Sequence, residues 1–168
     1  MNALDRTRRS LTHADRRDAL GALAAVVGVN LVGASPAIAF GSDTGWIDRP
    51  AFYPPEWAFG VVWTVLFTLL GIALWLVVRD GVDSRPVRVA VGLFVVQMAV
   101  NVAWTPAFFG LRSPLAGLAV IVPLWFLVVM TIYAFDRVDR RAAALLVPYL
   151  AWVSFAVVLN VEIWRLMN

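Results

Sequence analysis

Five long stretches without a charged residue alternate with short segments that carry the charges. The stretches cover residues 19–40, 57–78, 89–111, 113–135 and 142–161. Each reaches the length of about 20 residues that a helix needs to cross the roughly 30 Å hydrocarbon core of a bilayer. Because backbone polar groups find no water in that core, each stretch must be helical. The pattern predicts an all-α integral membrane protein with a bundle of five transmembrane helices.

The segments between these stretches are too short to hold a second domain. We therefore expect an N-terminal tail over residues 1–18 and a single membrane domain over residues 19–168, with residues 41–56 as its longest connection. The chain is 61% hydrophobic and 15% charged, whereas soluble domains are about 45–50% apolar and about 25% charged. This excludes a soluble enzyme, a nucleic-acid-binding domain and a disordered protein. The net charge of +3 does not indicate nucleic acid, since the arginines lie in connecting segments.

The arginines also predict how the chain is oriented in the membrane. Eleven of the 14 lie in the N-terminal tail and in the second and fourth connections, and three lie in the alternate set of segments. The positive-inside rule places the richer set in the cytoplasm, so the N-terminus is expected inside and the C-terminus outside. The first stretch also has features of a signal peptide, but its 22 residues exceed the usual 7–15 of such an apolar region. We expect it to remain as a span; cleavage would leave four.

The first connection differs from a flexible tether because it is apolar and rich in proline. It carries Trp46, Pro50, Pro54 and Pro55. One interpretation is a lid over a site at the outer face. The alternative is an interfacial segment that aromatic side chains anchor to the membrane surface.

Several amide and indole side chains lie deeper than an interfacial belt of aromatic residues would place them. Gln97, Asn101 and Trp104 fall at i, i+4 and i+7, which puts them on one helix face. Trp152, Ala156 and Asn160 share a face of the fifth span, and Trp63 lies at a similar depth on the second. Unpaired amides are costly in lipid, so these faces should point into the bundle. They would line an aromatic cavity under the first connection, or they are the hydrogen-bonded packing of an ordinary helix interface.

No set of catalytic or metal-ligating residues is visible in the sequence. The five stretches contain no Asp, Glu, Arg or His, which proton pumps and charged-ring ion channels usually require. Ala99, Ala103 and Ala107 form a small-residue stripe on the third span. Such a stripe permits close helix packing, either against a neighbour in the bundle or in a homodimer.

Three segments carry a more specific pattern. They are residues 54–59 (PPEWAF) with 62–67 (VWTVLF), residues 101–114 (NVAWTPAFFGLRSP), and residues 148–156 (PYLAWVSFA) with the Asn160 and Trp164 that follow. In order and spacing the chain resembles the TspO/MBR family, the tryptophan-rich sensory proteins and translocator proteins, from about Trp46 to Asn168.

The resemblance implies five helices, a dimer in many members, and a pocket for porphyrins and other flat hydrophobic ligands under the first connection. By motif, that pocket would use Trp63, Gln97, Asn101, Trp104, Trp152, Ala156 and Asn160. Two departures concern the ligand. Ile47 stands where members often have tyrosine, and no tyrosine lies close before Arg165 to complete the sterol motif of animal members.

These observations lead to one expectation and two alternatives. We expect a receptor- or sensor-type protein, in the cell membrane of a prokaryote, that binds a porphyrin or haem-type tetrapyrrole, or a similar flat hydrophobic ligand, and requires no cofactor. The first alternative is an enzyme that degrades porphyrin under light and oxygen. The second is a transporter of hydrophobic molecules, which the absence of an inverted repeat and of charge within the spans disfavours.

Overall fold

The computed structural model describes the backbone of residues 3–168 and the side chains of residues 16–168. Within this range the chain folds into helices and contains no strand. The elements in order are α1 (Ala3–Phe40), α2 (Glu56–Val78), α3 (Arg85–Thr105), η1 (Pro106–Gly110), α4 (Pro114–Asp136), α5 (Arg140–Leu145) and α6 (Val147–Leu166). Five segments are long and apolar enough to cross a membrane, which confirms the predicted architecture.

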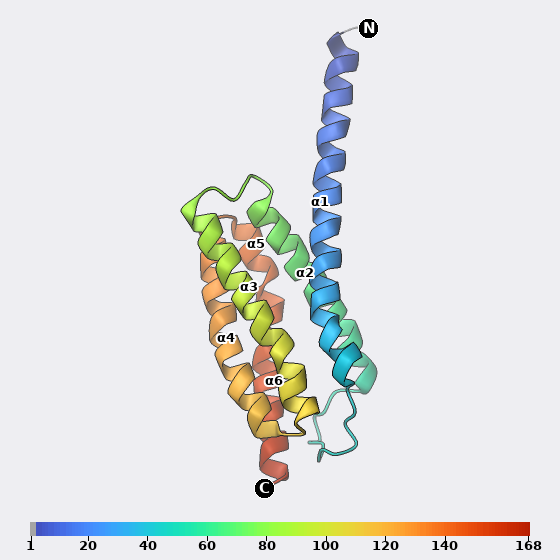
Figure 1. Cartoon of the computed structure of the whole chain (residues 1–168), viewed down its shortest axis with the longest axis vertical. Coiled ribbons are helices and arrows are strands. Elements are labelled where there is room, and N and C mark those ends of the chain that lie inside the picture. Colours follow the sequence, from blue (N-terminus) through green and yellow to red (C-terminus); the bar gives the residue numbers. More distant parts are fainter. Residues whose placement is uncertain (1–2) are drawn as a thin grey trace.

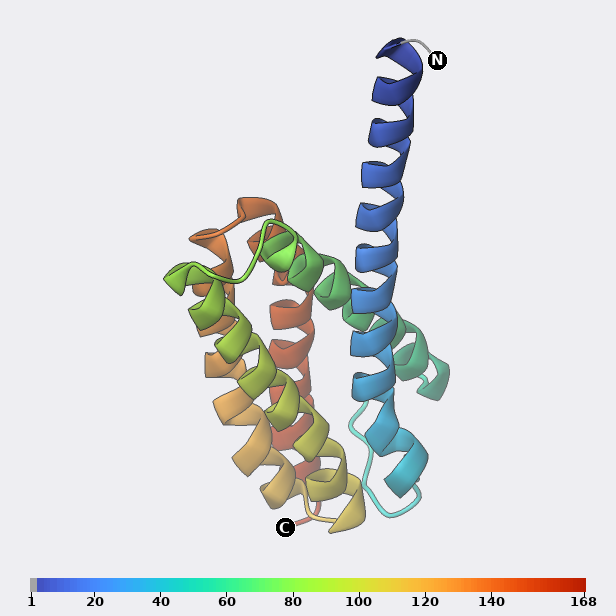
Figure 2. The same cartoon turned by 45° about the horizontal axis from the view of Figure 1, so that its top comes forward.

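The five spans form a bundle with all connections at its two ends (Figure 1). One end holds the α2–α3 and α4–α5 connections, and we call it the arginine-rich end. The opposite end holds the first connection (residues 41–55), the turn between η1 and α4, and the C-terminus, and we call it the loop end (Figures 1 and 2). The side chains of Arg79, Arg85, Arg88, Arg137, Arg140 and Arg141 belong to the arginine-rich end.

The helices α3 and α4 each begin where a capping serine side chain meets an unpaired backbone N–H. Ser84 Oγ accepts from the backbone N–H of Val87 at the start of α3, and Ser113 Oγ accepts from that of Ala116 at the start of α4. A proline follows each cap, at Pro86 and Pro114, where a missing N–H costs nothing. These capping serines define the residues at which the two helices begin, which hydropathy alone does not determine.

Two spans are interrupted where the sequence predicts continuous helices. At Pro106 the third span passes from α-helix into the π-helical turn η1, where the backbone N–H of Leu111 donates to the carbonyl of Pro106. Near Pro148 the fifth span is divided at Leu146 into α5 and α6. The cause is the same, because proline has no N–H to donate and its ring crowds the preceding turn.

The first helix packs at the side of the bundle, mainly against α2. Gly71 on α2 lies so close to α1 that a Cβ atom there would stand 2.5 Å from Cα of Val26. Such close approach is typical of membrane helices that pack through small residues. The predicted tail is continuous with this helix, which begins at Ala3 and runs past the neighbouring helices (Figure 1). The side chains of residues 3–15 lie outside the described residues.

Candidate ligand-binding site

A cavity of about 470 Å³ opens toward the loop end of the bundle. Residues of α1, α2, α3, η1, α4, α6 and the first connection form its walls, including Asn30, Gly33, Thr44, Tyr53, Glu56, Phe59, Trp63, Phe67, Asn101, Trp104, Phe108, Leu124, Trp152, Ala156 and Asn160. Its size falls within the range of about 300–1,000 Å³ typical of small-molecule sites. A hollow between the helices is therefore present, as opposed to a fully packed interface.

Three of the cavity's walls carry an indole ring. Trp63 stacks on Phe67 with 5.1 Å between ring centroids, and Trp104 stacks on Phe108 at 5.0 Å. Trp152 meets Phe59 edge to face at 5.9 Å. Each tryptophan is held by another aromatic ring, so its face toward the cavity is fixed before any ligand arrives. Rigid aromatic walls suit a flat, apolar molecule.

Asn101 brings a polar group to the cavity wall. Its Nδ2 donates to the hydroxyl of Tyr149 at 2.9 Å, and that hydroxyl donates to Oε1 of Gln97 at 3.1 Å. Its Oδ1 receives no hydrogen bond from any described residue, and Asn101 lines the cavity. The free oxygen is thus an acceptor for a ligand N–H or O–H group.

The structure corrects the expected position of Gln97, which does not line the cavity. Its side chain is fully buried, and Nε2 has no hydrogen-bond partner among the described residues. Helical spacing places Gln97 on the same face as Asn101 but one turn further from the loop end, where Tyr149 fills the space. Spacing alone does not show this, because it defines the face of one helix and not the side chains that the neighbouring helix supplies.

Asn160 lines the cavity, yet both its amide atoms are already bonded. Nδ2 donates to the carbonyl of Pro114 at 2.9 Å, and Oδ1 accepts from Nε1 of Trp104 at 3.4 Å. A Cβ at Gly117 would lie 2.7 Å from this Oδ1, so the glycine makes room for the amide. Asn160 holds the cavity wall together and orients the Trp104 indole.

The first connection lies against the cavity, but through residues other than those predicted. Thr44 and Tyr53 line it, whereas Trp46, Pro50, Pro54 and Pro55 do not. Trp46 packs on Phe108 at 5.3 Å and donates from Nε1 to the carbonyl of Asp43. Ile47 is buried against η1 and α6, in a cluster with Phe108, Leu159 and Ile163. The tryptophan and the isoleucine attach the connection to the bundle, and the prolines shape its path.

A charged cluster fastens the two ends of the connection to each other. Arg49 Nη2 lies 2.7 Å from Glu56 Oε1 and donates to Thr44 Oγ1 at 2.5 Å. The guanidinium also lies over the Tyr53 ring, 5.2 Å from its centroid. Burial raises the pKa of the Tyr53 phenol above its ordinary value, and the nearby Arg49 charge opposes that rise. We call these four residues, Thr44, Arg49, Tyr53 and Glu56, the latch.

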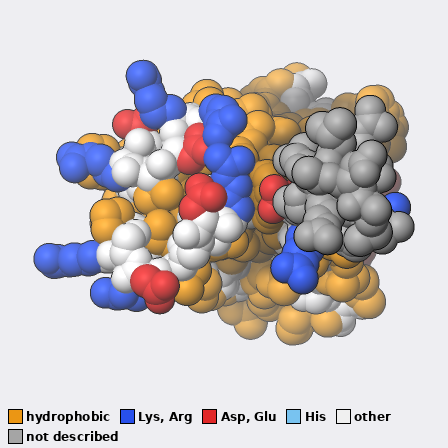
Figure 3. All heavy atoms as spheres, turned by 90° about the horizontal axis from the view of Figure 1, so that it is seen from above, with side chains coloured by type: hydrophobic (Ala, Val, Ile, Leu, Met, Phe, Trp, Pro, Cys, Tyr) orange, Lys and Arg blue, Asp and Glu red, His pale blue; other side chains and the backbone are white. Residues whose placement is uncertain are grey.

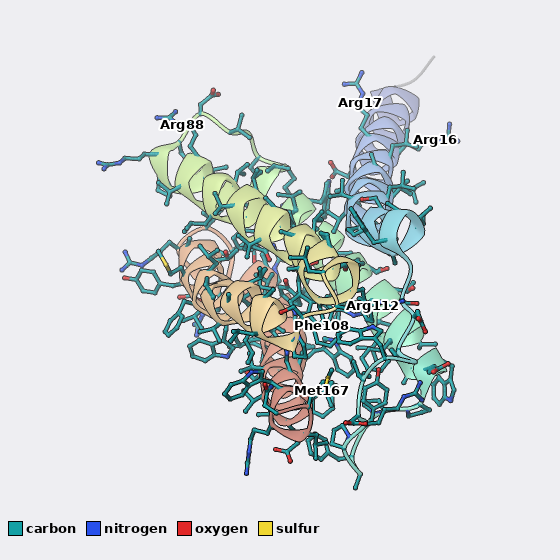
Figure 4. All side chains as sticks on the ribbon, turned by 60° about the horizontal axis from the view of Figure 1, so that its bottom comes forward. Arg16, Arg17, Arg88, Phe108, Arg112 and Met167 are labelled. Carbon is teal, nitrogen blue, oxygen red and sulfur yellow. The ribbon has the colours of Figure 1, made fainter. Side chains whose placement is uncertain are left out.

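A second contact between the connection and the bundle is weaker. Arg112, in the turn between η1 and α4, lies 3.8 Å from Asp43, and both side chains are largely exposed. Figure 4 looks toward this end and shows Arg112 and Phe108 in the same region of the bundle. Exposed ion pairs of this kind contribute little, so the buried Ile47 cluster is the main attachment of the connection to the bundle. The Arg49–Glu56 pair of the latch is itself partly exposed and joins the ends of the connection to each other.

The remaining predicted positions fall into two groups. Ala156 lines the cavity beside Trp152, as its spacing indicates. Ala99 and Ala103 are exposed on the outer surface of α3, and Ala107 is half-buried. The alanine stripe therefore serves no close packing inside the bundle at its first two positions, and a homodimer through it stays a prediction.

The geometry defines a class: a five-span membrane protein with an aromatic cavity that opens at one end of the bundle, beside a latched connection. Within residues 16–168, no three His, Asp or Glu side chains gather as metal ligands. The arrangement can bind and orient an apolar molecule.

Comparison with known proteins places the chain within this class. The model of the TspO/MBR family matches residues 20–165, and the chain belongs to that family. It is 49% identical to the tryptophan-rich protein TspO of Chlorobaculum tepidum over 118 residues, which are 70% of this chain and 75% of the relative. It is 37% identical to protein CrtK of Rhodobacter capsulatus over 128 residues, 74% of this chain and 80% of the relative. The human translocator protein is 36% identical over 120 residues, 71% of each chain.

Proposed function

We propose that this protein is a membrane receptor or sensor that binds a porphyrin, or a similar flat hydrophobic molecule, in the cavity at the loop end. One observation carries the proposal: Trp63, Trp104 and Trp152 line a single hollow of about 470 Å³. Each indole is braced by a second aromatic ring. Such walls can contact both faces of a flat ring system at low cost in side-chain entropy.

The polar groups of the cavity support a particular orientation of the ligand. Thr44, Tyr53 and Glu56 lie at its mouth, whereas the deeper wall is formed by Phe67, Leu124 and other apolar residues. Asn101 Oδ1 is the acceptor available further in. A ligand with an apolar ring body and polar substituents on one edge would place that edge toward the connection, because burying it in the apolar end would leave it without hydrogen bonds.

The distribution of arginines supports an orientation for the whole protein. The arginine-rich end would face the cytoplasm and the loop end the outside, following the positive-inside rule. The ligand would then enter from the outer face or from the outer half of the bilayer.

The proposal is tested by titrating protoporphyrin into the purified chain in detergent micelles and following the absorption of the porphyrin. Replacing Trp152 or Trp63 by Phe should weaken binding about threefold to tenfold, since an aromatic contact contributes about 0.5–1.5 kcal/mol. Trp125→Phe is the matched control, because this indole donates to Ser154 Oγ and does not line the cavity. The site would be refuted if the wild type and the three variants bound protoporphyrin with equal affinity. It would also be refuted if empty micelles took up protoporphyrin as strongly as micelles that contain the protein.

A further inference from the structure

A second hollow lies at the arginine-rich end, far along α3 and α4 from the cavity. It is a groove of about 580 Å³ between the first turns of α3 and the last turns of α4. Its walls are Arg85, Val89, Leu93, Val129, Met130 and Arg137, among others. The groove shares no residue with the cavity described above, so binding there is independent of the proposed function.

The two arginines at the groove have no carboxylate partner within residues 16–168. Neither Arg85 nor Arg137 forms a salt bridge there, whereas Arg79, Arg140 and Arg141 at the same end each lie within 4 Å of an aspartate. Arg137 instead lies 4.6 Å from the centroid of the Tyr133 ring and donates to its hydroxyl. Two uncompensated positive charges therefore stand where the groove meets the membrane surface, and Figure 3 shows the basic side chains projecting around this end.

Below the arginines the groove is apolar and open to the outside of the bundle. Val89 is 50% and Met130 51% exposed, although both belong to membrane-spanning helices. Leu93 lies eight residues beyond Arg85, which corresponds to a depth of about 12 Å at 1.5 Å per residue. The groove thus runs from the charged membrane surface into the hydrocarbon layer.

We propose that this groove binds an anionic phospholipid. Its phosphate would lie between Arg85 and Arg137, and one acyl chain would follow the groove between Leu93 and Val129. Both parts of the lipid match what the groove offers: positive charge at headgroup depth and an apolar channel beneath it. Basic pockets between helices on the cytoplasmic side are a recognised way of holding anionic headgroups. A zwitterionic lipid offers the same chains but no net charge to the arginines.

The test is native mass spectrometry of the full-length chain in micelles with phosphatidylglycerol or phosphatidylcholine added. We expect preferential retention of phosphatidylglycerol, and a loss of affinity of about tenfold in the double variant Arg85→Gln/Arg137→Gln. The control is Arg16→Gln/Arg17→Gln, which removes the same charge from α1, on the other side of the bundle from Arg88 in the first turn of α3 (Figure 4). The control should keep the preference of the wild type.

A third variant tests the apolar part of the groove without changing its charge. Val129→Trp fills the space beside Met130 and should lower phosphatidylglycerol retention severalfold. Three results would overturn the proposal: equal losses in the two double variants, no preference of the wild type for the anionic lipid, or a groove variant that changes the oligomeric mass while keeping its lipid. The last would identify the groove as an interface with a second copy.

Discussion

Asn101 on α3 donates a hydrogen bond of 2.9 Å to the hydroxyl of Tyr149 on α6, and so joins the cavity wall to the buried interior. Tyr149 is fully buried and meets Trp63 edge to face at 6.3 Å. Its hydroxyl in turn donates to Gln97. One phenol thus positions an amide of the cavity and supports one of its indoles, although it does not line the cavity itself.

Removing this hydroxyl should destabilise the bundle. In Tyr149→Phe, Asn101 Nδ2 and Gln97 Oε1 lose their shared partner while the ring packing is kept. Hydrogen bonds between membrane helices contribute about 0.6 kcal/mol on average, and leaving buried groups unsatisfied adds to this. We expect a loss of about 1–2 kcal/mol, measured as a lower thermal unfolding midpoint in micelles.

Tyr133→Phe is the matched control for the Tyr149 variant, because this tyrosine is exposed near the end of α4. Its unfolding midpoint should stay close to that of the wild type. If the two variants unfold together at the wild-type temperature, the network around Tyr149 does not stabilise the protein.

The fold could be predicted from the sequence because each span is marked by the absence of charge over about 20 residues. The same signal cannot show where a span is interrupted. Pro106 and Pro148 are visible in the sequence, but whether a proline kinks, divides or merely begins a helix depends on which neighbouring groups satisfy the freed carbonyls. Here the chain forms the π-helical turn η1 at the first and divides at Leu146 near the second.

The sequence predicted the residues of the site only where their spacing places them on one face of a helix. Asn101, Trp104, Trp152, Ala156, Asn160 and Trp63 all line the cavity, because residues spaced by one turn share a face. Gln97 and Tyr149 show the limit, since their positions depend on how two helices fit together. The first connection has no periodicity at all, so its proline content indicated stiffness but not that Thr44 and Tyr53 would form the wall.

The contact between α1 and α2 should tolerate no side chain at Gly71. A Cβ atom there would stand 2.5 Å from Cα of Val26 and 2.9 Å from its nitrogen. Backbone atoms cannot rotate away, so Gly71→Ala must push the helices apart. Overpacking of this kind costs about 1–3 kcal/mol, which thermal unfolding of the purified variant measures.

Gly92→Ala separates this effect from a general change in helix propensity. Gly92 lies on α3 with no atom within 4 Å of the position of a Cβ. Alanine favours helix over glycine by about 1 kcal/mol, so this variant should be as stable as the wild type or slightly more so. A Gly71 variant that matches it would contradict the close packing of α1 on α2.

The latch should control how fast a ligand leaves. Arg49→Gln removes the ion pair with Glu56 and the cation over Tyr53, and it leaves the indoles of the cavity in place. We expect release of bound protoporphyrin to become faster by about twofold to fivefold, since exposed pairs contribute up to about 1 kcal/mol. Stopped-flow mixing of the loaded protein with excess empty micelles measures the rate.

Arg165→Gln is the control for the latch. Arg165 also pairs with a glutamate at the loop end, Glu162 at 3.5 Å, but neither residue belongs to the cavity wall. Its release rate should equal that of the wild type. The latch has no role in retention if the Arg49 variant releases the ligand no faster than this control.

The connection between α4 and α5 should make the protein sensitive to acid. Asp139 caps α5 by accepting from the backbone N–H of Arg141 and also pairs with that guanidinium at 2.9 Å. The hydrogen bond from the Arg141 side chain is the main cause that lowers the pKa of Asp139 from 3.8 to about 2. A carboxyl whose pKa is lower in the folded state stabilises the protein above its unfolded pKa and loses that contribution as the pH falls. Stability should therefore decrease between about pH 4 and pH 2 in the wild type.

Asp139→Asn, which keeps a capping oxygen but cannot ionise, should show a smaller decrease over this range in thermal unfolding. Parallel decreases in both proteins would show that other carboxyl groups cause the acid sensitivity.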